Sequence, residues 1–353
     1  MLRGLVKASV AGAARALGAD RAIRALHDPG RWPVVVGYHR VVDDLRRHRA
    51  DTIPAMLISR AMLERHLDWL GRRYRVVTAA ELESWLDGDG ADATRPVAMI
   101  TFDDGYHDVY EHAFPLLKRK GLPATVFVVS DLVGTARAPL HDRLYVALAR
   151  ARAARRTPPA VTTALASLPP DATNPVTATH ALLARRPQAE VRRLVETLES
   201  EIGADDTALD AMRLLTWETL AEMQRNGITV GAHTRTHPVL TNETPAVVAM
   251  ETAGARRDLE TRLGVPVHHF AYPAGCFDTT AVDAVAAAGY RLAYTACRHR
   301  DPRRPRLTLS RTLLWERSSA DPWQRFSPSI LACQLNGVFD LLGGCSQTHG
   351  LAA

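Results

Sequence analysis

The sequence predicts an α/β fold in which a parallel sheet is covered by helices. Apolar strand-like runs alternate with amphipathic helical stretches along most of the 353 residues. The runs are almost continuously apolar, which is typical of strands buried on both faces of a parallel sheet. At this length a barrel or distorted barrel is the favoured arrangement, and an open doubly wound sheet is the alternative.

Six apolar runs are the expected strands, and they cover residues 33–39, 97–102, 125–130, 228–233, 268–272 and 291–296. Helical patterns lie between them, at about residues 60–72, 79–86, 107–120, 216–225, 245–263 and 279–288. Thr244 followed by Pro245 indicates the start of a helix. Gly121, Gly227 and Gly289 each follow a helical stretch, where a left-handed cap residue is expected.

Three segments depart from this alternation, and they divide the chain around a barrel domain expected at residues 31–322. Residues 1–30 read as a helical extension. Residues 137–213 contain several prolines and then a helix-like stretch, which predicts a mainly helical insertion between two core strands. Whether this insertion covers the mouth of the site or packs outside the barrel is left open. Residues 323–353 have weak periodicity, so partial disorder is expected there.

Composition favours a soluble enzyme over a nucleic-acid-binding protein. The apolar fraction is 46%, and the formal net charge is only +6 over the whole chain. No basic stretch interleaved with aromatic residues appears, so we expect no nucleic-acid partner. The four cysteines include no CxxC pair, which argues against a thiolate zinc site and favours reduced thiols.

The first residues indicate neither a convincing signal peptide nor a membrane span, because no stretch approaches about 20 apolar residues. A cytoplasmic location is therefore expected. At helical spacing this segment also has an apolar stripe flanked by basic residues, which predicts either peripheral membrane contact or packing on the domain's own surface. The stripe consists of Leu2, Leu5, Val6 and Val10, and the flanking residues are Arg3, Lys7 and Arg15.

Two adjacent carboxylates, Asp103 and Asp104, end the apolar run at residues 97–102 and precede Gly105. In α/β sheets, functional side chains gather where strands end in loops. Neighbouring carboxylates repel each other unless a cation lies between them. One of the two can therefore bind a metal while the other stands over it, although a solvated Asp-Asp-Gly turn is the competing interpretation.

Two imidazoles four residues apart, His233 and His237, follow the run at residues 228–233. One carboxylate and two imidazoles form a three-ligand set that leaves a metal coordination position open. The remaining carboxylate is then available as a base, an arrangement that suits metal-assisted hydrolysis. Two surface histidines are the alternative, but both segments end strands of the same expected sheet.

These segments resemble the motifs of the polysaccharide deacetylases of the NodB-homology, chitin-deacetylase-like carbohydrate esterase family. TFDDGY at residues 101–106 resembles the first motif, and HTRTH at residues 233–237 resembles the second. FAYPAG at residues 270–275 is similar to the third, usually an F-R-x-P-x-G-like stretch. The resemblance covers residues 33–296 without the insertion, and it implies a distorted (β/α) barrel of about seven strands.

The resemblance also implies roles for individual residues in removing N-acetyl groups from N-acetylated glycans. Asp104, His233 and His237 would bind a divalent metal, most often Zn²⁺, and Asp103 would be the general base. The backbone N–H near Ala274 would hold the oxyanion of the tetrahedral intermediate. The neighbouring side chains expected to contact substrate are Tyr106, Tyr272 and Pro273.

The chain departs from the family pattern in two places. Ala271 replaces the third-motif Arg that usually orients the base, and Arg311 or Arg40 would have to reach in from another loop. The usual C-terminal His has no clear counterpart, because His299 lies in a basic loop and His349 in the tail. His39, in a Y-H-x-V-like stretch that ends the first strand, is the candidate for substrate contact or for the acid.

Three functions remain open from the sequence. A metal-dependent N-deacetylase is favoured. A catalytically weak glycan-binding relative is the second hypothesis, because the usual Arg and His are missing, and a hydrolase of other amides is the third. The basic loop at residues 298–306 further suggests an acidic or lipid-linked glycan substrate, or else is a solvated loop.

Overall fold

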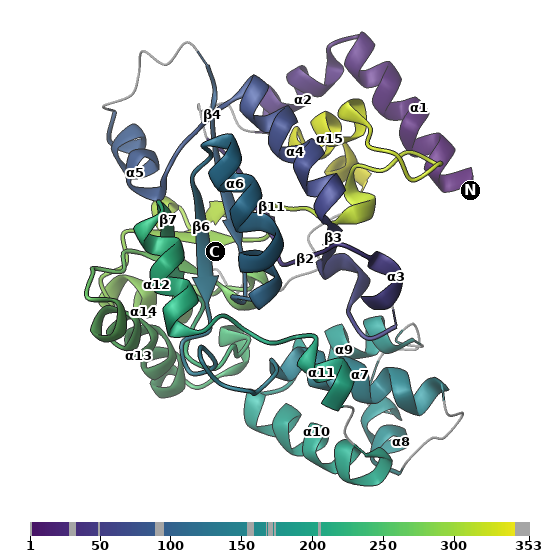
Figure 1. Ribbon diagram of the computed structural model, residues 1–353, viewed down its shortest axis with the longest axis vertical. Helices are drawn as coiled ribbons and strands as arrows, with labels where there is room; N and C mark the ends of the chain where they lie inside the picture. The colour runs from purple at the N-terminus through teal and green to yellow at the C-terminus, as the bar shows by residue number, and fades with distance from the viewer. Residues whose placement is uncertain are drawn as a thin grey trace.

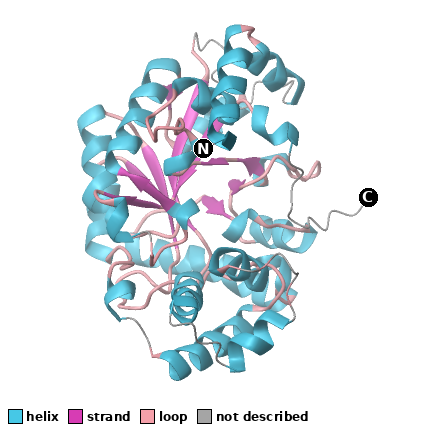
Figure 2. Ribbon diagram, turned by 90° about the vertical axis from the view of Figure 1, so that its right-hand side faces the viewer, coloured by secondary structure: helices cyan, strands magenta, loops and turns pink. Residues whose placement is uncertain are grey.

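The structure, a computed structural model, describes residues 2–27, 33–48, 50–88, 95–153, 159–166, 168, 172, 174–203 and 206–342. Parallel strands stand at its centre, and helices surround them (Figures 1 and 2). The main sheet follows the order β10-β9-β8-β7-β6-β5-β1-β11, and β4 pairs with the beginning of β5. The strands are β1 Val34–Tyr38, β2 Arg40–Val42, β3 Leu57–Ser59, β4 Arg75–Val76, β5 Val97–Phe102, β6 Ala124–Val128, β7 Ile228–Ala232, β8 His269–Ala271, β9 Leu292–Thr295, β10 Leu309–Ser310 and β11 Thr312–Leu313.

The path of eight strands is a nearly closed barrel, which confirms the predicted distorted (β/α) barrel. Its two end strands, β10 and β11, are consecutive in the chain and are separated only by Arg311. Six of the eight strands are the apolar runs expected from the sequence. The structure adds β10 and β11, whose two residues each are too few to show a periodic pattern.

The helices cover the outside of this barrel and form two further groups at opposite ends of the molecule (Figure 1). The α-helices are α1 Leu2–Ala16, α2 Ala19–His27, α3 Leu45–His48, α4 Arg60–Arg73, α5 Ala79–Asp87, α6 Phe114–Lys120, α7 Leu140–Ala153, α8 Pro159–Ala166, α9 Pro175–Leu183, α10 Gln188–Ile202, α11 Asp206–Asp210, α12 Trp217–Arg225, α13 Pro245–Leu263, α14 Thr279–Ala287 and α15 Pro328–Leu335. A π-helix, η2, spans Val109–Ala113, and the short 3-10 helices are η1 Pro54–Met56, η3 Leu240–Asn242, η4 Pro273–Gly275, η5 Pro305–Leu307, η6 Glu316–Ser318 and η7 Val338–Leu342.

Local sequence signals account for the ends of these helices. The Thr244 side chain accepts a hydrogen bond from the Val247 N–H, as the Thr-Pro signal predicts for the start of α13. Gly121 ends α6 with a φ of 62°, in the left-handed conformation that glycine adopts without penalty. The predicted helix at residues 107–120 is divided, because its first part is the π-helix η2.

Side-chain alternation along the strands builds two apolar layers. Successive strand residues point to opposite faces. On β5, Ala98, Ile100 and Phe102 pack outward against the helices, whereas Val97 and Met99 point into the barrel. The interior cluster continues across the barrel to Phe127 of β6, Ala271 of β8 and Tyr294 of β9.

Helices α7 to α11 form the insertion between β6 and β7, and they lie below the barrel in Figure 1, at the end to which the β6 arrow points. Carboxyl ends of parallel strands share one edge of a sheet, so the insertion lies on the side of the barrel where functional loops gather. The sequence left open whether this segment reaches the site. The structure shows that it does.

Helices α1 and α2 lie at the other end, where α1 packs against α15 (Figure 1). Ala11 of α1 is buried against Ile330 and Cys333 of α15, so packing on the domain's own surface is what the structure shows. Four of the six large apolar side chains exposed among the described residues nevertheless lie on α1 or just after it: Leu5, Val6, Val10 and Leu17. Membrane contact through this face stays a prediction. Within the described ranges, no helix is long and apolar enough to cross a membrane.

Part of the segment after Trp323 forms helices although its periodicity is weak. Ser327 caps α15 by accepting a hydrogen bond from the Ile330 N–H, and Ile330, Leu331 and Cys333 are fully buried. Packing against α1 and the barrel therefore supplies the order that local periodicity did not indicate. Residues 343–353, including His349, lie outside the described residues.

Candidate active site

Asp103 and Asp104 follow β5 and point in different directions because of the backbone between them. Asp103 continues the alternation of β5 on the inward face, together with Met99 and Thr101. Asp104 adopts a φ of 67°, which is uncommon for a residue other than glycine and turns its side chain away from the barrel axis. Gly105 follows with a φ of 77°, and a Cβ there would lie 2.9 Å from Val128 Cγ1. The tight turn therefore requires glycine at this position.

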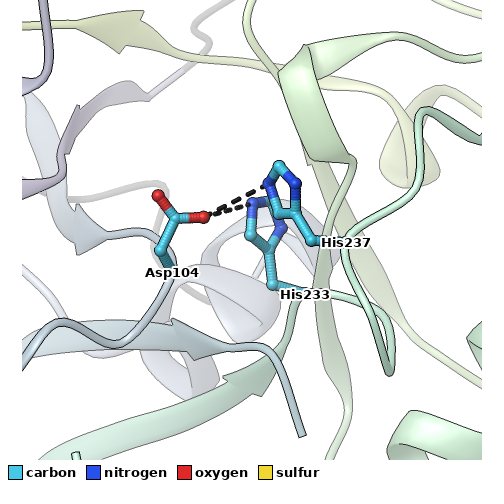
Figure 3. Close-up of side chains that lie close together, drawn as sticks. All are labelled: Asp104, His233 and His237. Atoms are coloured by element: carbon cyan, nitrogen blue, oxygen red, sulfur yellow. Dashed lines mark ion pairs between the residues drawn. The ribbon is translucent and has the colours of Figure 1, made fainter. Parts of the chain in front are cut away.

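Asp104, His233 and His237 converge at the mouth of the barrel (Figure 3). Asp104 Oδ1 lies 3.6 Å from His233 Nε2 and 3.2 Å from His237 Nε2. Each of the three side chains offers one ligand atom, and these three atoms lie within 4.8 Å of one another. The sequence predicted this set, and the structure brings its three members together.

The donor set fits a divalent metal. His233 Nδ1 lies 2.7 Å from the Ala271 carbonyl oxygen, so Nδ1 carries the proton and leaves a lone pair on Nε2, which faces Asp104. Burial lowers the pKa of His233 to about 4, which favours the neutral, ligating imidazole. Asp104 Oδ1 is buried and accepts no well-formed hydrogen bond, as expected of an atom placed to meet a cation. An N, N, O set of this kind accepts Zn²⁺ and similar ions.

Neighbouring histidine side chains keep Asp104 ionised in spite of its burial. Burial by itself would raise the pKa of this carboxyl group. The adjacent His237 imidazole, with contributions from His141 and His39, outweighs that effect and holds the pKa of Asp104 well below its usual range. A carboxylate ligand is therefore in place at neutral pH.

The third motif has Ala271 at the position of the usual Arg, and Arg311 makes the contact with Asp103 instead. Its Nη1 and Nη2 atoms donate to the two carboxylate oxygens of Asp103 at 2.6 and 2.7 Å, and Nη1 also lies 3.1 Å from Thr101 Oγ1. Burial raises the pKa of Asp103, but the Arg311 charge outweighs it, and the net pKa is lowered. Arg311 stands at the junction of β10 and β11, so the seam of the barrel supplies the residue that orients the Asp103 carboxylate.

Arg40, the other candidate for this role, does not reach Asp103. Its Nε donates to Asp108 Oδ2 at 2.8 Å, and its Nη1 donates to Thr52 Oγ1 at 2.7 Å. Its guanidinium is therefore committed to these two partners and does not contact Asp103.

His39 lies at the mouth of the barrel, as predicted for a residue that ends β1. Its Nε2 is 3.9 Å from Asp103 Oδ2, and its side chain is 16% exposed. It thus has access both to solvent and to the carboxylate that would act as the base. His299, the other histidine considered for this part of the chemistry, lies in the loop after β9.

Ala274 and Gly275 shape the third motif. Ala274 is exposed and has a φ of 55°, and Gly275 follows with a φ of 70°. A Cβ at Gly275 would lie 2.5 Å from the backbone nitrogen of Ala296, so only glycine fits against this segment. Four of the five described non-glycine residues with positive φ lie in the three motifs, namely Asp104, Thr234, His237 and Ala274. Such strained conformations gather at functional sites.

The structure places two of the predicted substrate contacts in the interior. Tyr106 and Tyr272 are both fully buried. The Tyr106 hydroxyl donates to Asp142 Oδ2 at 2.6 Å, and the Tyr272 hydroxyl donates to the Leu307 carbonyl at 3.0 Å. Both side chains are therefore committed to the interior, and Pro273 is buried beside Tyr272. Their position in the motifs secures the loops and does not present these rings to a ligand.

His141 and Asp142 lie in the first turn of α7 in the insertion, and neither was predicted from the sequence as a site residue. His141 Nε2 lies 3.0 Å from the Tyr106 hydroxyl and 3.9 Å from Asp104 Oδ2, and its ring centroid is 4.8 Å from that of His237. The adjacent His-Asp pair just after a proline-bounded turn was the available signal. Without the fold, nothing in the chain placed it beside the metal ligands.

Comparison with known proteins identifies the family. The family model described as "Polysaccharide deacetylase" matches residues 90–293, more than half of the chain, so the chain belongs to the polysaccharide deacetylase family. A Bacillus subtilis (strain 168) protein described as "Putative polysaccharide deacetylase YxkH" is 33% identical over 91 residues, which is 26% of this chain and 32% of that protein. The chain thus matches about a third of the length of this relative. His39 and Arg311 lie outside the region that the family model matches.

Solved structures agree on the fold. The Streptococcus pyogenes deacetylase PplD in complex with acetate is similar with a TM-score of 0.55 at 18% identity, over 86% of this chain and 97% of that one. IcaB from Ammonifex degensii gives a TM-score of 0.53 at 22% identity, over 87% and 98%. BC0361, a polysaccharide deacetylase from Bacillus cereus, gives 0.51 at 17% identity, over 86% and 68%.

Proposed function

We propose that this protein is a metal-dependent N-deacetylase that hydrolyses N-acetyl groups of an N-acetylated sugar in a polysaccharide or glycan precursor. The observation that carries the proposal is the geometry at the mouth of the barrel. Asp104, His233 and His237 converge on one point, and a second carboxylate, Asp103, is held beside them by Arg311. A ligand set with a separate, oriented base suits hydrolysis in a chain of this family.

Asp104, His233 and His237 would hold the ion, which when bound lowers the pKa of water and polarises the amide carbonyl. Asp103 takes the proton of the attacking water, and the bidentate Arg311 contact keeps both carboxylate oxygens in one orientation during that transfer. The exposed backbone at Ala274 is the proposed donor to the developing oxyanion, and a backbone donor does not depend on the side chain there.

His39 is the proposed acid for the leaving amine. It follows β1, which lies on one side of β5, whereas His233 and His237 follow β7 on the other side. Its side chain has partial access to solvent. In the overall reaction, water supplies the hydroxyl group to the acyl carbon and a proton to the sugar nitrogen. The products are acetate and a free amine.

The alternative of an inactive glycan-binding relative is less well supported. It rested on the missing third-motif Arg and the missing C-terminal His. Arg311 now accounts for the first, and His39 supports an answer to the second. A pure binder also has no use for an oriented carboxylate beside a metal set. Hydrolysis of a non-sugar amide on the same scaffold stays as an alternative for the substrate panel to decide.

The basic loop at residues 298–306 offers little support for an anionic or lipid-linked substrate. Four of its five arginines lie against acidic side chains of the same chain, which neutralise much of their field. The pairs are Arg298 with Asp340, Arg303 with Asp301 and Asp283, Arg304 with Asp283, and Arg306 with Asp87. We therefore favour a neutral N-acetylated glycan.

Acetate release from a panel of N-acetylated glycans tests the proposal, using purified wild-type protein and Asp103→Asn, each with and without added Zn²⁺. We expect release that depends on the metal and falls by about 10²–10⁴-fold in the variant, which loses its general base. Bound Zn²⁺ should be the same in both proteins, because Asp103 is not in the ligand set. Stoichiometric metal with no release from any glycan would instead favour the binding protein or a non-sugar amidase.

A further inference from the structure

The helical insertion contacts the metal-binding loops at two separate places. The start of α7 contacts the loop after β5, which contains Asp104. The start of α10 contacts the loop after β7, which contains His233 and His237. A segment that packed only on the outer surface of the barrel would not contact both loops.

At the first contact, hydrogen bonds link Asp142, Tyr106 and His141, and His141 also lies beside Asp104 without a hydrogen bond to it. The Tyr106 hydroxyl has one proton and donates it to Asp142 Oδ2, so it accepts from the Nε2–H of His141. The same Nε2–H lies 3.9 Å from Asp104 Oδ2. That oxygen is the one turned away from His233 and His237, which face Oδ1. His141 thus holds Tyr106, two residues after Asp104, and lies beside the outer oxygen of the Asp104 carboxylate.

Packing alone does not explain these polar residues. His141 and Asp142 are buried, and each has one side-chain atom without a hydrogen-bond partner, Nδ1 and Oδ1 respectively. Burying such atoms costs free energy, and an apolar pair of similar size would avoid this cost. Polar residues kept under these conditions indicate a role at the neighbouring site.

At the second contact, Gln188 forms hydrogen bonds with the backbone and the side chain of Thr236, the residue before His237. Its Nε2 donates to the Thr236 carbonyl at 2.5 Å, and its Oε1 lies 2.7 Å from Thr236 Oγ1, whose single proton is shared between Gln188 Oε1 and Glu251 Oε1. Asn242, a few residues further on, donates to the Leu183 carbonyl at the end of α9. The loop of the two histidines is therefore bonded to the turn between α9 and α10.

The two contacts belong to one packed unit. Helices α7, α9 and α10 share an apolar core of their own, and a bidentate pair joins Arg143 of α7 to Glu199 of α10 at 2.9 and 2.6 Å. The buried members of this core include Leu144, Leu148, Leu182, Val191, Val195 and Leu198. A displacement at one contact is consequently transmitted to the other.

We propose that the insertion is a brace for the metal site, in which His141 and Gln188 are positioning residues that hold the Asp104 loop and the His233–His237 loop at ligating distance. This inference rests on the proposed metal-dependent function. It assigns to helices α7, α9 and α10 a role in ion affinity and coordination geometry. Partners of this kind typically change metal affinity by about 10–100-fold when they are removed.

Zn²⁺ affinity and the visible spectrum of the Co²⁺-substituted protein test the proposal in the full-length chain. His141→Leu removes the donor and keeps the bulk. We expect its Zn²⁺ Kd to rise by about 10–100-fold and its Co²⁺ bands to shift or weaken. His141→Gln places an amide N–H near the Nε2 position and should recover most of the affinity. Gln188→Leu should produce a smaller loss, because Glu251 still binds the Thr236 side chain and N–H.

His180→Ala is the matched control, since this histidine is exposed on α9 of the same insertion, and it should match the wild type in both measurements. A His141→Leu protein that folds, with an unchanged Zn²⁺ Kd and Co²⁺ spectrum, overturns the brace. If that variant does not fold, Gln188→Leu decides by the same criterion. Wild-type protein that binds neither ion refutes the proposed function itself, which separates the two failures.

Discussion

Asp103 and Asp104 show how adjacent identical residues acquire different chemistry. The strand alternation sends Asp103 inward, where Arg311 neutralises it, and the left-handed backbone at Asp104 turns the second carboxylate toward two imidazoles. The roles follow from the backbone and from the charged neighbour, and the residue type is the same. The Asp-Asp pair in the sequence would not by itself have assigned these roles.

Arg311→Met should be strongly destabilising and should lower turnover. The change leaves the buried Asp103 carboxylate without its cation, and breaking one side of a buried ion pair costs about 3–5 kcal/mol. Arg311→Lys, the matched comparison, keeps the charge but loses the bidentate fork, so it should retain more stability and only part of the activity. Urea unfolding and acetate release measure the two effects. Met and Lys variants with equal, wild-type stability would contradict the assigned role.

His66 should make the fold sensitive to acid. It is buried between the Tyr38 hydroxyl and Ser319 Oγ, and burial lowers its pKa to about 3. Above about pH 6.5 the imidazole is neutral in both folded and unfolded states, and its contribution to stability is complete. As the pH falls from 6.5 toward 3, only the unfolded state takes up the proton, so stability drops by about 1.4 kcal/mol per pH unit.

Urea unfolding between pH 7 and pH 4.5 measures this slope, with His66→Gln as the comparison because glutamine can still donate and accept in the interior. The variant should be less stable at pH 7 but should lose less stability on acidification. A slope that is identical in wild type and His66→Gln would show that another group is responsible.

At the level of elements, the sequence predicted the parts that depend on local periodicity. The six apolar runs became β1 and β5 to β9. One carboxylate with His233 and His237 was predicted from strand ends and spacing, and the choice of Asp104 came from the family resemblance. The short strands β10 and β11 were missed because two residues carry no pattern. Arg311 was one of two candidates, since only the closed barrel shows that β10 and β11 lie beside β9 and β1. His141 was missed for the same reason, because its neighbours are distant in sequence.

The third-motif turn should tolerate no side chain at Gly275. Gly275→Ala places a Cβ 2.5 Å from the Ala296 backbone nitrogen, in addition to the unfavourable left-handed backbone. Gly264→Ala is a matched control, because Gly264 has nearly the same φ, 69°, with no atom within 4 Å of the added Cβ. The control should lose about 1–2 kcal/mol from the backbone alone. Gly275→Ala should lose clearly more, by urea unfolding, together with activity. Equal losses would mean that the turn can move.

At the scale of the whole molecule, the site is assembled from every part of the barrel. The motifs supply ligands from β5 and β7, the seam supplies Arg311, β1 supplies His39, and the insertion supplies His141. These groups meet only when the sheet closes, because they are spread over more than 270 residues of the chain, from His39 to Arg311. Ion binding should therefore be coupled to global folding.

Zn²⁺ should accordingly raise the melting temperature of the whole protein. An ion that binds the folded state alone stabilises it by about 2.7 kcal/mol at one hundred times its Kd, which corresponds to a shift of about 4 °C for a chain of this size. The shift should disappear in His237→Ala, which lacks one ligand, and persist in Asp103→Asn, which keeps all three. Thermal unfolding of chelator-treated protein, before and after Zn²⁺ is restored, gives the comparison. An equal shift in His237→Ala would place the ion elsewhere, because a site of Asp104, His233 and His237 needs the whole barrel and all three side chains.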